Sequence, residues 1–196
     1  MNTDQLLQRV AAGESSAALT LVTRHRDRLR RMVAVRLDRR LAARVDPSDI
    51  VQDAITEAYL RLPKFAVERP MAFYPWIRRI AFERLLQMHR RHIAAQRRSV
   101  LREDALPLTE ESEILLAEKV AGGTVASDRA LRSEIRRRVH HAMEQLAIVD
   151  REVIALKHLE ELKFQEVADV LEVSLATVHS RYYRAIKKLK QLLGTE

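Results

Sequence analysis

Apolar residues recur at helical spacing near the end of the chain, over residues 164 to 186. They lie three or four positions apart, first before and then after Ser174. The Ser174 hydroxyl is placed to cap a second helix, because it can accept from a backbone N–H that has no partner within the helix. The pattern predicts two short helices joined by a tight turn. The residues expected in their core are Val167, Leu171, Val178, Tyr182, Ala185 and Leu189.

The outer face of the second predicted helix carries hydroxyls, an aromatic ring and cations. Such side chains can donate to phosphates and base edges in a DNA major groove, so the pair is interpreted as a helix-turn-helix. An ordinary amphipathic pair with a solvated basic face is the alternative. Glu172 stands where a turn glycine is usual, and we expect it to adopt a positive φ at modest cost. The residues of this face are Ser180, Tyr183, Arg184 and Lys187, with Thr177 and His179 nearer its edge.

Three further helices are predicted in the first half of the chain, over residues 15–42, 47–62 and 73–98. Asp46 is expected to cap the second of these, with Pro47 at its first position and Pro63 as its stop. The composition fits this pattern, because Gly and Pro number only four and five and β-branched runs are scarce. We therefore predict an all-α protein.

Charge is distributed unevenly along the chain. The net charge is +8, which favours a polyanionic partner. Residues 76–98 carry seven Arg and one Glu, whereas residues 99–118 carry one Arg and six acidic residues. We interpret 99–127 as a linker, with one short helix near 110–120, between two small helical domains at 1–98 and 128–196.

Several protein classes are disfavoured by what the sequence lacks. Without cysteine there is no disulfide framework and no thiolate metal site. No apolar run is long enough to span a bilayer, and the N-terminus lacks a signal-peptide pattern, so we expect a soluble cytoplasmic protein without membrane insertion. His89 and His92, with Glu83, suggest a metal-dependent hydrolase as a rival. The surrounding arginines oppose a cation there, so no metal, cofactor or catalytic residue is predicted.

Two stretches of the first domain could bind macromolecules. The helix at 47–62 has an acidic polar face in a basic domain, which suits a basic protein surface; a plain solvated face is the alternative. The stretch FYPWIRRIAFERLLQMHRRH places aromatic rings before dense arginines, as in a platform for unstacked bases. Core anchoring of Phe73 and Trp76 is the alternative for the rings. The first face holds Asp49, Gln52, Asp53, Thr56 and Glu57; the second stretch holds Phe73, Tyr74, Trp76, Arg78, Arg79, Arg84, Arg90 and Arg91.

Taken in order, these motifs resemble bacterial sigma factors of the sigma-70 family, in the extracytoplasmic-function (ECF) group. The resemblance spans about residues 17 to 193 and is strongest in DPSDIVQDAITEAYLRL, in FYPWIRRIA and in REVIALKHLEELKFQEVADVLEVSLATVHSRYYRAIKKL. It implies a region 2-like bundle and a region 4-like helix-turn-helix. The implied function is transcription initiation with core RNA polymerase. A stand-alone helix-turn-helix regulator is the rival reading, but no added dimerisation helix is evident.

The resemblance assigns partners to the faces. Asp49, Gln52, Asp53 and Thr56 would contact the β′ clamp helices of the polymerase. Residues 73–98 would open and hold the -10 element as single-stranded DNA, and the second domain would contact the β flap and read duplex -35 DNA. The residues implied in -35 contacts are Thr177, His179, Ser180, Arg181, Tyr183, Arg184 and Lys187. Any regulator, such as an anti-sigma factor, would be a separate protein.

Two positions depart from the family pattern, and one motif residue has an ambiguous place. Glu83 stands in a stretch where relatives often have Asn, near the pocket for a flipped base, so base preference is expected to differ. His179 replaces a frequent Arg or Lys, which predicts a weaker contact near neutral pH. Arg181 lies beside the apolar stripe, and we expect it to form a salt bridge.

Overall fold

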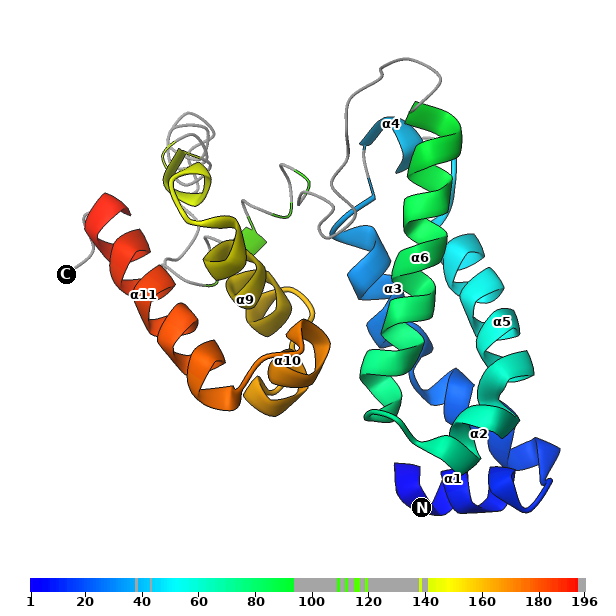
Figure 1. Cartoon of the computed structure of the whole chain (residues 1–196). Coiled ribbons are helices and arrows are strands. Elements are labelled where there is room, and N and C mark those ends of the chain that lie inside the picture. Colours follow the sequence, from blue (N-terminus) through cyan, green and yellow to red (C-terminus); the bar gives the residue numbers. More distant parts are fainter. Residues whose placement is uncertain are drawn as a thin grey trace. The chain divides into compact units, whose positions relative to one another are not determined.

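The computed structural model describes residues 1–93 except 38 and 43, the single positions 109, 112, 115, 116, 119 and 138, and residues 141–193. The chain divides into two compact units, Met1–Pro107 and Leu108–Glu196. All elements in the described residues are helices, which confirms the all-α prediction (Figure 1). The bounds predicted for the two domains and the linker stay predictions.

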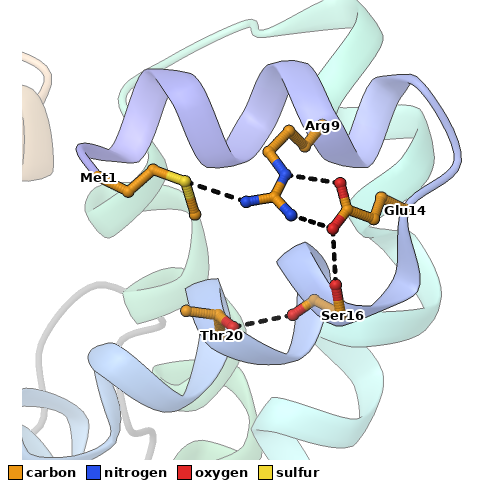
Figure 2. A network of polar contacts seen from close by, with 5 residues as sticks. All are labelled: Met1, Arg9, Glu14, Ser16 and Thr20. Carbon is orange, nitrogen blue, oxygen red and sulfur yellow. Dashed lines mark hydrogen bonds and ion pairs between the residues drawn. The ribbon is translucent and has the colours of Figure 1, made fainter.

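The first helix of the N-terminal unit, α1 (Thr3–Ala11), was not predicted. It begins with a capping box in which Asn2 and Gln5 exchange hydrogen bonds of 2.9 Å between side chain and backbone. At its other end, the Arg9 guanidinium pairs with Glu14, which also accepts from the Ser16 hydroxyl at 2.7 Å (Figure 2). The hydrogen bonds from Arg9 hold the pKa of Glu14 below its usual value. This network fixes the turn from α1 into the next helix.

The single helix predicted over 15–42 is wrong, because the structure divides it into α2 (Ser15–Arg24), α3 (Arg26–Ala34) and α4 (Arg39–Ala42). The first break falls at His25, where φ is −96° and ψ is 0°. The His25 ring is buried, with its centroid 5.2 Å from that of Phe73 and 5.6 Å from that of Tyr74. Tertiary packing of this ring accompanies the break, and no glycine or proline marks it in the sequence.

Helix α5 (Pro47–Glu68) begins as predicted, with the Asp46 carboxylate accepting from the backbone N–H of Ser48 at 2.7 Å. Its predicted end at Pro63 is wrong. The helix continues to Glu68, because Pro63 lies on the exposed face and Phe65 and Ala66 beyond it are buried. Burial of that last turn offsets the backbone hydrogen bond that proline removes.

Helix α6 (Phe73–Ile93) packs along α5 and α3, and α5 also contacts α1 and α2 (Figure 1). The core of this bundle is mainly aliphatic, with Leu21, Leu29, Ile50 and Leu85 almost fully buried. The predicted continuation of α6 over 94–98 lies outside the described residues. The bundle thereby holds the polar face of α5 and the arginine-rich face of α6 on one rigid scaffold.

The C-terminal unit contains α9 (Ile148–His158), α10 (Phe164–Leu171) and α11 (Leu175–Leu193), with α11 packed against both others (Figure 1). The predicted helix pair is confirmed. Glu172 has φ 53° and ψ 42°, the left-handed conformation expected in place of a glycine. Ser174 caps α11 by accepting from the backbone N–H of Thr177 at 3.1 Å.

Most of the predicted linker lies outside the described residues. Its described positions 112, 115, 116 and 119 have helical backbone, in agreement with the short helix predicted near 110–120. Leu116 is fully buried, and Lys119 Nζ donates to the carbonyl oxygen of His158 at 3.0 Å. This part of the segment is therefore built into the C-terminal unit.

Candidate nucleic-acid and protein interfaces

The polar face of α5 is exposed over its whole first half. The side chains of Asp49, Gln52, Asp53 and Thr56, which we call the acidic strip, all lie at the surface. They are opposite the buried residues Val51, Ala54 and Ala58 of the same helix. Asp49 lies in the first turn, where the helix dipole stabilises a carboxylate. The acidic strip is thus formed before any partner binds.

Glu57, which follows the acidic strip, has a different environment. Its half-buried carboxylate forms ion pairs with Arg61 on α5 and with Arg84 on α6. Arg84 Nε donates to it at 2.5 Å, so one of the arginines predicted to bind DNA is joined to a carboxylate of the same chain. This ion pair links α5 to α6.

The aromatic platform predicted for the start of α6 is corrected in part. Phe73 and Tyr74 are buried, which supports core anchoring as the interpretation of Phe73. Trp76 is half-buried and stacks on Phe65 with ring centroids 4.2 Å apart. The Arg28 guanidinium lies 3.8 Å from the centroid of the Tyr74 ring. The rings gain more from packing between α3, α5 and α6 than from contact with water.

The arginines of α6 fall into two groups. Arg78 is buried, with its guanidinium 5.8 Å from the Phe82 ring centroid. Arg79 lies 3.5 Å from the Glu83 carboxylate, one turn along the helix, and both are exposed. Arg90 and Arg91 are exposed near the end of the helix. The accessible cationic face of α6 is therefore formed by Arg79, Arg84, Arg90 and Arg91.

The predicted reading face of α11 is exposed in the structure. Tyr183 leaves 70% of its surface accessible, and Ser180 and Lys187 are also exposed, one turn before and one turn after it. Thr177 is half-buried at the N-terminal end of this face. His179 is exposed and contacts the edge of the Phe164 ring, with centroids 4.7 Å apart. These side chains provide hydroxyl donors, a ring and a cation on one helix face.

The ion pairing of two arginines on this helix differs from the expectation. Arg184, predicted to contact DNA, donates from Nε and Nη2 to the carboxylate of Asp150 on α9 at 2.7 and 2.5 Å. These hydrogen bonds to the Asp150 carboxylate raise the pKa of Arg184. Arg181, expected to form a salt bridge, has no ion-pair partner among the described residues, so that expectation is wrong. Helix α9 lies beside α11 where Arg184 can reach it, and its first turn supplies the carboxylate.

A cluster of three rings, His158, Phe164 and Tyr182, joins α11 to α9 and α10 and was not predicted. His158 Nε2 lies 3.1 Å from the Tyr182 hydroxyl, and Tyr182 packs edge-on against Phe164. Burial, and then the charges of Lys157 and Lys119, lower the pKa of His158. Burial also raises the pKa of Tyr182. Only the helical spacing of Tyr182 signalled this cluster in the sequence, because its partners come from α9 and from the start of α10.

No group of three potential metal ligands occurs among the described residues, which include His89 and Glu83 but not the side chain of His92. None of the described helices is both long enough and apolar enough to cross a membrane.

Comparison with known proteins identifies the class to which these interfaces belong. The family model for Sigma-70 region 2 matches residues 21–94, and the model for Sigma-70 region 4 matches residues 136–189. Together they cover more than half of the chain, in the order bundle and then helix-turn-helix. The chain belongs to the sigma-70 family and to its ECF group, and its function is that of a sigma factor in transcription initiation.

Individual relatives match over nearly the full length. The ECF RNA polymerase sigma-E factor of Haemophilus influenzae is 29% identical over 185 residues, covering 93% of this chain and 91% of its own. RNA polymerase sigma-H factor of Pseudomonas aeruginosa is 27% identical, covering 96% and 92%. A solved structure of CnrH in complex with the cytosolic domain of CnrY has a TM-score of 0.56 at 24% identity, covering 100% and 99%, and shares the fold.

Proposed function

We propose that this sigma factor divides its binding tasks among three surfaces. The acidic strip docks on the β′ clamp helices of core RNA polymerase, the cationic face of α6 holds single-stranded -10 DNA, and the exposed face of α11 reads duplex -35 DNA. One observation carries the proposal: in a strongly basic domain, the first half of α5 presents exposed carboxylates on its solvent side and contains no Lys or Arg. Carboxylates repel DNA and favour a basic protein surface.

On α6, the proposed DNA contacts are made by exposed side chains and not by the buried rings of Phe73 and Tyr74. Arg90 and Arg91 are placed to neutralise phosphates, and Arg79 lies beside Glu83 at the position assigned to an extruded base. Phe73, Tyr74 and Arg78 support this surface from the core in the free protein. Trp76, half-buried, is the ring of this group with the most accessible surface.

On α11, Ser180, Tyr183 and Lys187 are exposed one turn apart and are proposed to make the first contacts with the -35 duplex. Arg184 is proposed to contact the duplex through Nη1, because this atom makes no bond to the Asp150 carboxylate. Thr177, His179 and Arg181 complete the assigned set at the margin of the face. The β flap of polymerase is proposed to contact the same unit.

A separate protein regulator and a cytoplasmic location belong to this proposal, as does the absence of an enzymatic activity. CnrH, which has a similar fold, was solved with a protein partner, the cytosolic domain of CnrY. An anti-sigma factor that covers the acidic strip would block polymerase docking.

Run-off transcription with purified core polymerase and genomic promoter fragments tests the proposal. Promoter-specific transcripts are expected only when the protein is added. If core enzymes from several bacteria, including the source organism, give no such transcripts, the assignment of three cooperating surfaces is wrong.

The role of the acidic strip is tested separately by charge reversal. Asp49→Arg and Asp53→Arg are expected to abolish core binding while leaving the helical circular dichroism signal intact, because both side chains are exposed. Asp27→Arg, which reverses an exposed first-turn aspartate on α3, is the matched control and should bind core normally. Unchanged core affinity in the two strip variants would remove this role from α5.

A further inference from the structure

The solvent side of α5 continues beyond the acidic strip as an apolar surface. Leu60 and Val67 leave 76% and 73% of their surface exposed, and Pro63 between them is exposed as well. We call these three residues the apolar strip. Leu60 follows Thr56 by four positions, and the three lie at intervals of three and four, so both strips share one face of one helix.

This face points directly away from the core. The buried side of the same turns is formed by Ala58, Leu62 and Phe65, and the apolar strip lies opposite them. Leucine and valine there gain almost no burial when the domain folds. Single exposed apolar residues are ordinary on protein surfaces, but three in line with a set of exposed carboxylates form a contiguous patch of defined direction.

The charged residues next to the apolar strip are already neutralised within α5. Glu57 pairs with Arg61, and the Lys64 ammonium lies 3.8 Å from the Glu68 carboxylate, in both cases one turn apart. A partner covering the strip therefore meets no isolated charge on this flank. On the other flank lies Tyr59, which is 38% exposed and adds a ring to the apolar area.

We propose that the acidic and apolar strips form one docking surface, about 27 Å long at 1.5 Å per residue, for core RNA polymerase. The element that binds it presents cations to Asp49 and Asp53 and aliphatic side chains to Leu60 and Val67, as an amphipathic helix lying along α5 would. The inference rests on the proposed function and extends it, because the apolar half supplies affinity and the acidic half supplies orientation. An acidic strip alone would bind in either direction along a basic helix, whereas the two-part surface fixes one direction.

The test measures equilibrium affinity of the full-length protein for core polymerase by competition with a labelled wild-type chain. Leu60→Gln/Val67→Gln is expected to bind at least about tenfold more weakly, since it removes aliphatic area that the complex would bury. Leu19→Gln is the matched control, because Leu19 is 61% exposed on α2, away from α5's outer face. The control should bind like wild type, and all three proteins should unfold at similar temperatures.

The failures of the two proposals are distinguishable. If Asp53→Arg loses core binding while Leu60→Gln/Val67→Gln binds like wild type, the apolar strip is not part of the surface and this inference is overturned, although the acidic strip keeps its role. An equal loss in Leu19→Gln would also overturn it, since the effect would not belong to α5. If Asp49→Arg and Asp53→Arg leave core affinity unchanged, the proposed docking role of α5 itself fails.

Discussion

Arg184 on α11 donates two hydrogen bonds to Asp150 on α9, a residue 34 positions earlier in the chain. The two side chains differ in environment, because that of Asp150 is 5% exposed and that of Arg184 is 59% exposed. The ion pair therefore fixes the position of α11 against α9 while one edge of the guanidinium remains open to solvent.

Removing the two partners is expected to have unequal effects. Arg184→Ala leaves a buried carboxylate without its donors, whereas Asp150→Ala leaves an exposed guanidinium that water can solvate. Arg184→Ala should therefore lower the thermal unfolding midpoint more than Asp150→Ala does, and the double variant should resemble Asp150→Ala. A double-mutant cycle followed by calorimetry measures this. Equal effects of the two single variants would contradict the burial asymmetry.

Leu116 lies in the segment predicted as a linker, yet it is fully buried in the C-terminal unit, while its neighbour Leu115 is 44% exposed. Leu116→Ala is expected to destabilise that unit by about 2–5 kcal/mol, as for other buried leucines, and Leu115→Ala to have little effect. Urea denaturation of the full chain compares them. Equal, small losses of stability in the two variants would indicate that Leu116 belongs to a solvated linker.

Glu172 adopts φ 53° at the turn of the helix-turn-helix. A residue with a Cβ is disfavoured there by about 1–2 kcal/mol, and glycine is not. Glu172→Gly is expected to be more stable than Glu172→Ala by about 1 kcal/mol, since both lose the same carboxylate and only the glycine variant relieves the backbone. Chemical denaturation of the two variants gives the difference directly. A more stable alanine variant would contradict the expected relief.

The pKa of His158 is lowered, mainly by burial and further by Lys157 and Lys119. The unfolded ring therefore takes up a proton at a higher pH than the folded ring. Stability should fall as pH decreases below the ordinary histidine value of 6.5, and the loss should level off below the folded pKa. His158→Gln retains hydrogen-bonding capacity toward Tyr182 and cannot titrate. The wild type should lose stability relative to this variant between pH 7 and pH 5; parallel curves would show that the ring is not destabilised by protonation.

Local chemistry explains which parts of the fold were predictable. The Asp46 cap, the Ser174 cap and the left-handed Glu172 depend on residues within three positions of each other, so the sequence contains the whole signal. The break at His25 depends on packing of its ring against Phe73. The continuation of α5 past Pro63 depends on the burial of Phe65. Those contacts join segments that are far apart in the sequence, so the spacing of apolar residues within one segment does not predict them.

The same distinction applies to the binding faces. Helical spacing correctly placed the acidic strip and the outer face of α11 at the surface. It could not show which arginines pair with a carboxylate, because Glu57 and Arg84 lie 27 positions apart and Asp150 and Arg184 lie 34 apart. For this reason the ion pair was expected at Arg181, whereas Arg184 forms it.

The pairing of Arg79, Arg84 and Arg184 with acidic side chains of their own chain has a consequence for ionic strength. Each phosphate that a free cation neutralises releases condensed counterions, and this release makes DNA affinity fall with added salt, with a slope of about 0.9 per contact on duplex DNA. A cation already balanced by a carboxylate contributes little to that release. Promoter binding should therefore tolerate salt better than the abundance of arginine in this chain would suggest.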